Sequence, residues 1–359
     1  MARILSVGTA VPQYVFRQNE VRQVVRKRFA SAFRDIDRLL PVFEHANIDT
    51  RHFCVPMEWY ETSHSFAEKN RLYVENALSL SVEAVKKCLQ KANVAPQDID
   101  CILFVSTTGL STPSIDAHIA NILEMKPSIR RLPLWGLGCA GGTAGIARGA
   151  ELARAYPGSL VLVVSVELCG LTFLGGDLSK SNLIATSLFG DGAAALLLTV
   201  DGDTSLRRPQ GATGFGVPRL IASQSTLWPD TVDIMGWELT DDGLKVIFSR
   251  DIPSFVQKWI PDAVDGFLAS QQLTRNDITR LIPHPGGMKV IQAYEESLGI
   301  KSELTYHARE VLRNYGNMSS ATVLFVLEKT IADEVSEGEY GLMTALGPGF
   351  SSELVLLQW

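Results

Sequence analysis

Continuous apolar runs of strand length alternate with longer segments of helical spacing along this chain. The run from Leu160 to Val166 is the clearest of them, and Glu167 ends it. A short run that is apolar at every position predicts a strand buried on both faces, which is typical of parallel sheets in α/β proteins. The run is also too short to cross a membrane, so no membrane span is expected.

One helix-to-strand passage occurs twice in the sequence. A helical segment ends near Leu89 and leads through a polar turn into an apolar run at Ile102, and the segment from Leu268 to Leu281 repeats this order. A single repeat of this kind could arise by chance. The two segments share five matched positions at one offset of 179 residues, namely 89/268, 94/273, 98/277, 99/278 and 102/281.

Two further repeats follow in the same order. Gly138-Cys139 opens a helical segment and Gly316-Asn317 opens another, at an offset of 178, and the apolar run from Val161 is matched by one from Leu342. Three repeats at nearly one offset predict a duplicated α/β architecture with two pseudo-equivalent halves, residues 1–205 and 206–359. We therefore expect the same helix N-terminus in each half, with Cys139 and Asn317 facing a shared site.

Bulk composition narrows the class of protein. With 359 residues, 46% hydrophobic and 20% charged, the chain can bury a large core and is globular rather than disordered. A net charge of −6 does not indicate nucleic-acid binding, so an anionic substrate would need a local basic patch. The five cysteines, at 54, 88, 101, 139 and 169, are odd in number and lack metal-ligand spacing. Together with an N-terminus that has no long apolar segment, they predict a reduced cytoplasmic protein without a metal site.

Candidate chemistry centres on Cys139, which stands between glycines where an apolar run gives way to an alanine-rich helical segment. A thiol at a helix N-terminus feels about half a positive charge from the peptide dipoles, which favours the thiolate. Free cysteine is often a small buried apolar residue. Gly138-Cys139-Ala140-Gly141-Gly142 is nevertheless a poor core sequence, and its glycines let a substrate approach the backbone. Cys139 is therefore a candidate nucleophile.

A histidine and an asparagine complete the candidate site. His284 follows a strand pattern and precedes Pro285-Gly286-Gly287, a turn that would hold its ring at the strand end; a structural role in that turn is the alternative. Asn317 could be a simple helix N-cap. Asparagine in place of aspartate argues against a proton relay. It suits two neutral hydrogen-bond donors at one oxygen, as when decarboxylation produces the enolate of a thioester.

Five motifs in this order resemble the chalcone synthase superfamily, the type III polyketide synthases of the thiolase fold. They are WGLGCAGGT at 135–143, SLFGDGAAA at 187–195, IPHPGG at 282–287, YGNMSSA at 315–321 and LGPGF at 346–350, and the resemblance covers essentially the whole chain. The first motif resembles in particular the Bacillus enzymes that make alkylpyrones. The resemblance implies an α/β fold of duplicated αβαβα layers. Its N-terminal half, residues 1–205, would carry the cysteine, and its C-terminal half, residues 206–359, the histidine and asparagine.

The family pattern also implies a mechanism. Cys139 would be loaded from an acyl-CoA starter, and malonyl-CoA would then decarboxylate while His284 and Asn317 hold the enolate oxygen. Attack of the enolate on the thioester, repeated two or three times, would give a poly-β-ketone that cyclises to triketide or tetraketide alkylpyrones. The family is homodimeric and uses no metal, redox cofactor or carrier protein, so the same is expected here.

Residues at the family's cavity positions suggest a fatty acyl starter. Phe189 matches an aromatic between the CoA tunnel and the cavity, with core packing as its alternative. Where the family has its second gate aromatic this chain has Val246, and where plant enzymes have a methionine it has Thr112, so both side chains are smaller here. Trp237, in contrast, lies near a position where plant enzymes have a glycine. An elongated apolar pocket is expected, in which each buried methylene contributes about 0.8 kcal/mol. The other matches to cavity positions are Thr107, Thr108, Cys169, Thr172, Ser319 and Gly349.

Few positions of this chain match the residues that bind coenzyme A in the family. Of the family's basic residues in an early helix only Arg38 has a match, since the next two positions hold Pro41 and His45. A solvated helix face is an equally good interpretation of the arginine-rich segment around Arg38. Gly286 and Lys289 are the other candidates, at the mouth of the tunnel.

Several alternatives remain open. The chain could be a type III synthase that forms alkylresorcinols or uses aromatic starters, or an initiating β-ketoacyl carrier-protein synthase, which also has Cys-His-Asn. The LGPGF ending favours the polyketide synthase. A hydroxymethylglutaryl-CoA synthase or a thiolase would need a further acidic or cysteine base that we cannot place. An inactive scaffolding relative would show no rapid labelling of Cys139 by iodoacetamide.

Overall fold

The computed structural model describes residues 1–30, 33, 35–200 and 217–359. Within them, nine strands form one mixed sheet in the order β11-β12-β13-β8-β1-β7-β6-β4-β5. Two small antiparallel pairs, β2 with β3 and β9 with β10, lie outside it. The bounds are β1 (Ala2–Ala10), β2 (Tyr14–Arg17), β3 (Thr50–Phe53), β4 (Cys101–Val105), β5 (Arg130–Leu134), β6 (Val161–Leu168), β7 (Asp191–Val200), β8 (Arg219–Leu227), β9 (Met235–Thr240), β10 (Gly243–Phe248), β11 (Ile278–Pro283), β12 (Tyr340–Gly347) and β13 (Ser351–Gln358).

The large sheet consists of two half-sheets with the same topology. In the run β1-β7-β6-β4 the first two pairings are antiparallel and the last is parallel, and the run β8-β13-β12-β11 repeats this pattern. The halves meet where β1 pairs with β8 over only two residue pairs. Strands β6 and β12 begin 179 residues apart, as the sequence repeat predicted. The duplication is therefore confirmed, whereas the predicted division between residues 205 and 206 lies outside the described residues.

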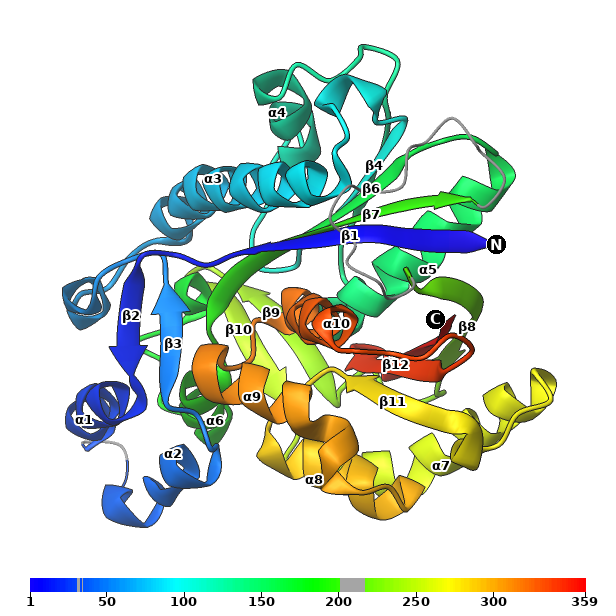
Figure 1. Ribbon diagram of the computed structural model, residues 1–359. Coiled ribbons are helices and arrows are strands. Elements are labelled where there is room, and N and C mark those ends of the chain that lie inside the picture. The colour runs from blue at the N-terminus through cyan, green and yellow to red at the C-terminus, as the bar shows by residue number, and fades with distance from the viewer. Residues whose placement is uncertain (31–32, 34, 201–216) are drawn as a thin grey trace.

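Helices lie between and outside the half-sheets, so the molecule has five layers (Figure 1). Helices α5 (Gly141–Ala155) and α10 (Thr322–Ala332) form the central layer and share one core cluster with strands of both halves. Helices α3 (Phe66–Ala92) and α4 (Ile115–Ile122) cover the N-terminal half-sheet. Helices α7 (Ile252–Ser270) and α8 (Met288–Leu298) cover the C-terminal one, and α9 (Tyr306–Tyr315) lies beside α10. The predicted layered α/β fold is confirmed.

A lateral group of short elements completes the fold. It comprises β2, β3 and the helices α1 (Gln18–Phe29), α2 (Pro41–His45) and α6 (Lys180–Leu188), which share a small core of their own. All five cysteines are buried free thiols, including the Cys88 and Cys101 side chains in apolar surroundings. No helix in the described part of the chain is both long enough and apolar enough to cross a membrane.

The two helix starts of the central layer are related less closely than the sequence suggested. Cys139 lies inside the 3-10 turn Gly138–Ala140 that precedes α5, whereas Asn317 stands two residues before the matching turn, Ser319–Ala321, that precedes α10. The turns themselves begin 181 residues apart, so the expected equivalence of Cys139 and Asn317 is wrong in register. Both residues nevertheless border one cavity, because the two turns pack directly against each other.

Candidate active site

Glycines create the packing that holds Cys139 at the start of α5. A Cβ added to Gly142 would lie 2.1 Å from the carbonyl oxygen of Ser320, so the two central turns can approach only without a side chain there. Gly138 has a φ of +48°, and a Cβ on it would lie 2.7 Å from Pro348. The WGLGCAGGT, YGNMSSA and LGPGF motifs therefore converge on one place in the fold, with the Cys139 side chain buried between them.

Asn317 is oriented by three neighbours. Its Oδ1 accepts a hydrogen bond from the backbone N–H of Ser319 at 2.8 Å and lies 4.0 Å from the Cys139 Sγ. Its Nδ2 donates to the carbonyl oxygen of Gly286 at 3.2 Å. An amide nitrogen carries two hydrogens, so one N–H of Asn317 remains available for a substrate.

His284 follows β11 directly, and its backbone N–H donates to the carbonyl oxygen of Thr344 on β12 at 2.7 Å. Its side chain is buried, and neither ring nitrogen has a hydrogen-bond partner. Buried polar atoms without partners are uncommon and need an explanation. The ring borders the same cavity as Cys139 and Asn317, so a bound substrate would supply the missing partner.

Burial opposes charge on the two titratable side chains of the site, Cys139 and His284. It raises the pKa of Cys139 to about 11, although hydrogen bonds involving Ser319 and Asn317 act in the other direction. Burial also lowers the pKa of His284 to about 3. The thiolate that the helix dipole was expected to favour is therefore disfavoured while His284 is neutral. A thiolate beside an imidazolium carries no net charge, so burial penalises such a pair less than it penalises either charge alone.

Sequence reasoning missed a buried carboxylate next to the cysteine. Glu167 was expected to end its apolar run, but β6 continues to Leu168 because hydrogen bonds satisfy the carboxylate inside the sheet. The Glu167 carboxylate accepts hydrogen bonds from Thr107, Thr108 and Ser320. Its charge raises the pKa of Cys139 further. An acidic residue at the end of an otherwise apolar strand was the signal that could have revealed it. Among the described residues, no group of three or more His, Cys, Asp or Glu side chains could hold a metal ion.

Four adjacent cavities lie on either side of Cys139. Each shares lining residues with the next. The outer cavity includes His45, Arg250, Gly286 and Lys289. The thiol cavity includes Cys139, His284 and Asn317, and shares Phe248, Ile252, Gly286 and Val290 with the outer one. The neck includes Cys139, Thr107, Ser319 and Pro348, and it shares Phe189, Trp237 and Val246 with the fourth cavity, the α1 pocket.

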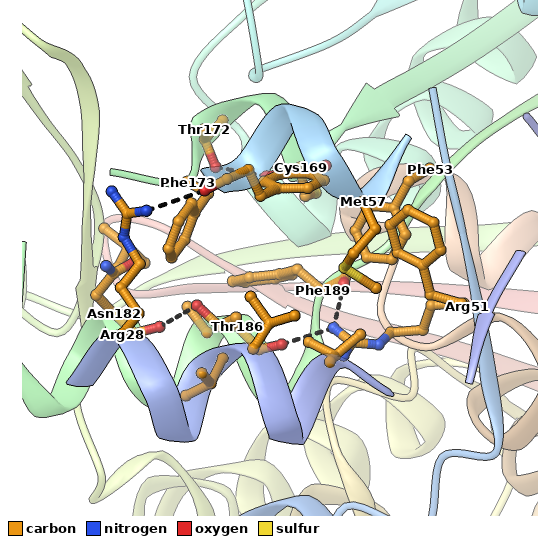
Figure 2. A pocket seen from close by; sticks show the side chains of 18 of the residues that line it. Arg28, Arg51, Phe53, Met57, Cys169, Thr172, Phe173, Asn182, Thr186 and Phe189 are labelled. Carbon is orange, nitrogen blue, oxygen red and sulfur yellow. Dashed lines mark hydrogen bonds between the residues drawn. The ribbon is translucent and has the colours of Figure 1, made fainter. Parts of the chain in front are cut away.

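The α1 pocket is lined mostly by apolar side chains. Figure 2 shows Phe189 near its centre, with Arg28 and Arg51 on opposite sides. Cys169 and Thr172 line it, as predicted for cavity residues. The valines of α1 were not predicted to do so, although their spacing at 21, 24 and 25 marks one apolar helix face. Val246, the predicted second gate position, forms a cross-strand pair of β10 and β9 with Trp237.

Four of the predicted residues lie away from these cavities. The Thr108 hydroxyl donates to Glu167, and Thr112 is exposed in the segment before α4. Gly349 has a φ of +133° in the turn before β13, where its neighbour Pro348 is the residue that lines the neck. Arg38 points its side chain into solvent, 85% exposed, and pairs with Asp35 at 2.9 Å. Gly286 and Lys289 do line the outer cavity, and Arg250 is a second cation there that sequence reasoning missed.

Known proteins match this chain along its whole length. The model of the chalcone and stilbene synthase N-terminal domain matches residues 1–202, and that of the C-terminal domain matches residues 219–359. A protein of Bacillus subtilis (strain 168) named "Putative chalcone synthase" is 48% identical over 365 residues, which cover 100% of this chain and 99% of the relative. The 1,3,6,8-tetrahydroxynaphthalene synthase of Streptomyces peucetius subsp. caesius is 34% identical over 357 residues, covering 99% and 93%.

A solved structure agrees with these matches. The crystal structure of 1,3,6,8-tetrahydroxynaphthalene synthase from Streptomyces coelicolor A3(2), a bacterial type III polyketide synthase, superposes with a TM-score of 0.91 at 28% identity and covers 99% of both chains. Fold, sequence and motif order thus point to one family. This chain belongs to the chalcone and stilbene synthases, the type III polyketide synthases, which are acyl-transferring condensing enzymes.

Proposed function

We propose that this enzyme loads a fatty acyl group from acyl-CoA onto Cys139, extends it by decarboxylative condensation with malonyl-CoA, and releases triketide or tetraketide alkylpyrones. The observation that carries the proposal is that Cys139, His284 and Asn317 border one buried cavity, with cationic side chains in the neighbouring cavity on one side and a mostly apolar pocket beyond the neck on the other. The proposed reaction uses no metal, redox cofactor or carrier protein. We further propose that the enzyme works in the cytoplasm as a homodimer.

Loading begins with proton transfer from the Cys139 Sγ to His284. The sulfur then attacks the thioester carbon of the acyl-CoA, the carbon–sulfur bond to CoA breaks, and the leaving thiolate takes the proton back from the imidazolium. Neither ring nitrogen of His284 has a hydrogen-bond partner, so the unprotonated one is free to accept this proton. The cationic side chains of Arg250 and Lys289 at the outer cavity would face the phosphates of CoA.

Extension needs no general base. When malonyl-CoA decarboxylates, the electrons of the breaking carbon–carbon bond move onto the thioester oxygen and CO₂ leaves. The neutral His284 ring and the free N–H of Asn317 would donate hydrogen bonds to that oxygen. The enolate carbon then attacks the acyl carbon on Cys139, the carbon–sulfur bond to Cys139 breaks, and the sulfur leaves as a thiolate. The extended chain, now a β-ketoacyl-CoA, transfers back to this sulfur with release of CoA before the next round.

The α1 pocket supports a fatty acyl starter because its walls are mostly apolar. Each methylene buried in such a pocket contributes about 0.8 kcal/mol, so a longer chain gains affinity until the pocket is full. The growing ketide would occupy the neck beside Phe189, where Thr107 and Ser319 supply polar groups. Ring closure through an enol oxygen gives a pyrone and needs little help from the protein, so we favour alkylpyrones over resorcinols.

A product profile tests the proposal. The purified enzyme would receive malonyl-CoA alone, or with acetyl-, hexanoyl-, decanoyl-, palmitoyl-, benzoyl- or p-coumaroyl-CoA, and products would be identified by mass spectrometry. Long-chain triketide and tetraketide pyrones are expected. A higher kcat/KM with p-coumaroyl-CoA than with decanoyl- to palmitoyl-CoA would overturn the starter assignment. Product from malonyl-CoA alone, or activity that requires a carrier protein, would replace the proposal.

Narrowing the neck should select against long starters. Val246→Phe adds a ring opposite Trp237, at the boundary that the neck shares with the α1 pocket. We expect kcat/KM for palmitoyl-CoA to fall by about tenfold relative to hexanoyl-CoA, because about two methylenes' worth of burial would be lost. Val232→Phe adds the same bulk at a side chain that is 80% exposed, and it should leave this ratio unchanged. Equal ratios in both variants would mean that acyl chains do not pass Val246.

A further inference from the structure

Arg51 is a buried cation that the proposed mechanism does not use. It lies on β3 with only 1% of its surface exposed, and it forms no ion pair with a carboxylate in the described part of the chain. Burial lowers the pKa of Arg51 to about 10, so the side chain is still charged at neutral pH. A buried charge is costly unless hydrogen bonds replace its hydration, so its partners indicate what it does.

Two of its three partners belong to the end of α6, and the third, Gln18, begins α1. Arg51 Nη1 donates to the carbonyl oxygens of Thr186 and Phe189, both at 2.7 Å, and Nη2 donates to Gln18 Oε1 at 2.7 Å. The last carbonyls of a helix lack partners within the helix and lie at the negative end of its dipole. Figure 2 shows the Arg51 side chain reaching the backbone beside Phe189. The planar guanidinium thus holds two carbonyls through Nη1 and is itself fixed by Gln18 through Nη2, so it restrains this backbone more than a single contact would.

The backbone that Arg51 holds is paired with that of Asn317. Gly190 N–H donates to the Asn317 carbonyl at 2.9 Å, and Asn317 N–H donates to the Leu188 carbonyl at 2.8 Å. Phe189 and Asn317 thus form an isolated parallel bridge. The residue at the neck and the proposed enolate donor therefore share one small backbone unit.

Glycines at both ends of this unit make the arrangement possible. A Cβ on Gly316, whose φ is +69°, would lie 2.7 Å from the Leu188 carbonyl oxygen and 2.8 Å from the Arg51 Cδ. A Cβ on Gly190 would lie 2.7 Å from the carbonyl oxygen of Tyr315. The bridge is closely packed against the aliphatic part of Arg51, so the arginine supports it by contact as well as by hydrogen bonds.

We infer that Arg51 is a positioning residue. Its guanidinium fixes the end of α6, so that the Phe189 side chain keeps its position in the neck and Asn317 keeps its position for enolate stabilisation. The inference rests on the proposed function of Asn317. Lysine at this position keeps the charge, but its single ammonium nitrogen cannot replace Nη1 at the two carbonyls and Nη2 at Gln18 at the same time. Small displacements of a group that stabilises a reacting atom reduce turnover strongly.

Arg51→Lys tests the inference, with Arg275→Lys as a matched control. Arg275 Nη1 also donates to a carbonyl in the last turn of a helix, that of Ser297 in α8, but it lies outside the cavities described above. Active sites would be counted by acylation of Cys139 in intact-mass spectra. Malonyl-CoA decarboxylation per active site is expected to fall about tenfold in Arg51→Lys, with the KM for malonyl-CoA within threefold of wild type. The length of the ketide products should also differ from that of the wild-type products.

Hydrogen exchange provides a readout that does not depend on turnover. The peptides that carry the Gly190 and Asn317 amides should exchange about tenfold faster in Arg51→Lys and at the wild-type rate in Arg275→Lys. Gln18→Leu leaves both Nη1 bonds in place but removes the Nη2 acceptor and the Gln18 Nε2 bonds to the Ser187 and Phe43 carbonyls, so a change of the same sign is expected if Arg51→Lys does not fold.

Two results would overturn the inference. In one, Arg51→Lys lowers the fraction of sites that can be acylated while the remaining sites decarboxylate at the wild-type rate, as a purely structural role requires. In the other, both amides keep their wild-type protection. A wild-type enzyme that does not decarboxylate malonyl-CoA would instead refute the proposed function, and hydrogen exchange would then decide the role of Arg51.

Discussion

Cys139→Ala is expected to lower ketide formation by at least ~10³-fold, because removal of a nucleophile that acts through a covalent intermediate eliminates the route itself. Intact-mass spectra after incubation with decanoyl-CoA should show the acyl adduct on the wild type and none on the variant. Decarboxylation of malonyl-CoA should continue within about tenfold of wild type, because the enolate donors His284 and Asn317 remain.

Cys101→Ala is the control for the alanine change itself. Cys101 is also a buried free thiol, but it lies in β4 and lines none of the four cavities. Its variant should be acylated and active like the wild type. An acyl adduct that persists in Cys139→Ala would identify another cysteine as the nucleophile and would remove the basis of the proposed reaction.

His284→Ala is expected to shift the pH dependence of Cys139 alkylation upward. Burial is the main reason why the pKa of this thiol is raised to about 11, so without a proton acceptor roughly one part in ten thousand would be thiolate at pH 7. Labelling by iodoacetamide at pH 7 should therefore be at least ~10²-fold slower than in the wild type. The rate in the variant should rise about tenfold per pH unit between pH 7 and pH 10, because each unit increases the thiolate fraction tenfold.

His284→Gln separates the two proposed roles of this side chain. An amide can donate a hydrogen bond to an enolate but cannot accept the thiol proton as a base. Slow labelling with substantial malonyl-CoA decarboxylation is expected. If His284→Ala were labelled as fast as the wild type at pH 7, the helix dipole alone would be sufficient to form the thiolate, and His284 would act only as a donor.

The sequence alone determined the architecture because a strand buried on both faces needs an unbroken apolar run, and such a run is visible without coordinates. The runs at Val161 and Leu342 became β6 and β12, at the offset that the sequence showed. Cys139 could be selected because glycines around a cysteine are a local feature. The register between Cys139 and Asn317 could not be fixed in this way, because glycine positions do not reveal where a 3-10 turn begins.

Tertiary structure decided the properties that depend on distant segments. Burial, which comes from packing of many elements, set the pKa directions of Cys139 and His284, although local sequence suggested a thiolate. The α1 pocket exists only because α1 lies against α6 and the β9–β10 pair. The roles of the buried Glu167 and Arg51 depend on hydrogen-bond partners that are far away in sequence. A sequence shows which groups are present, but solvation and distance decide their chemistry, and both arise from long-range packing.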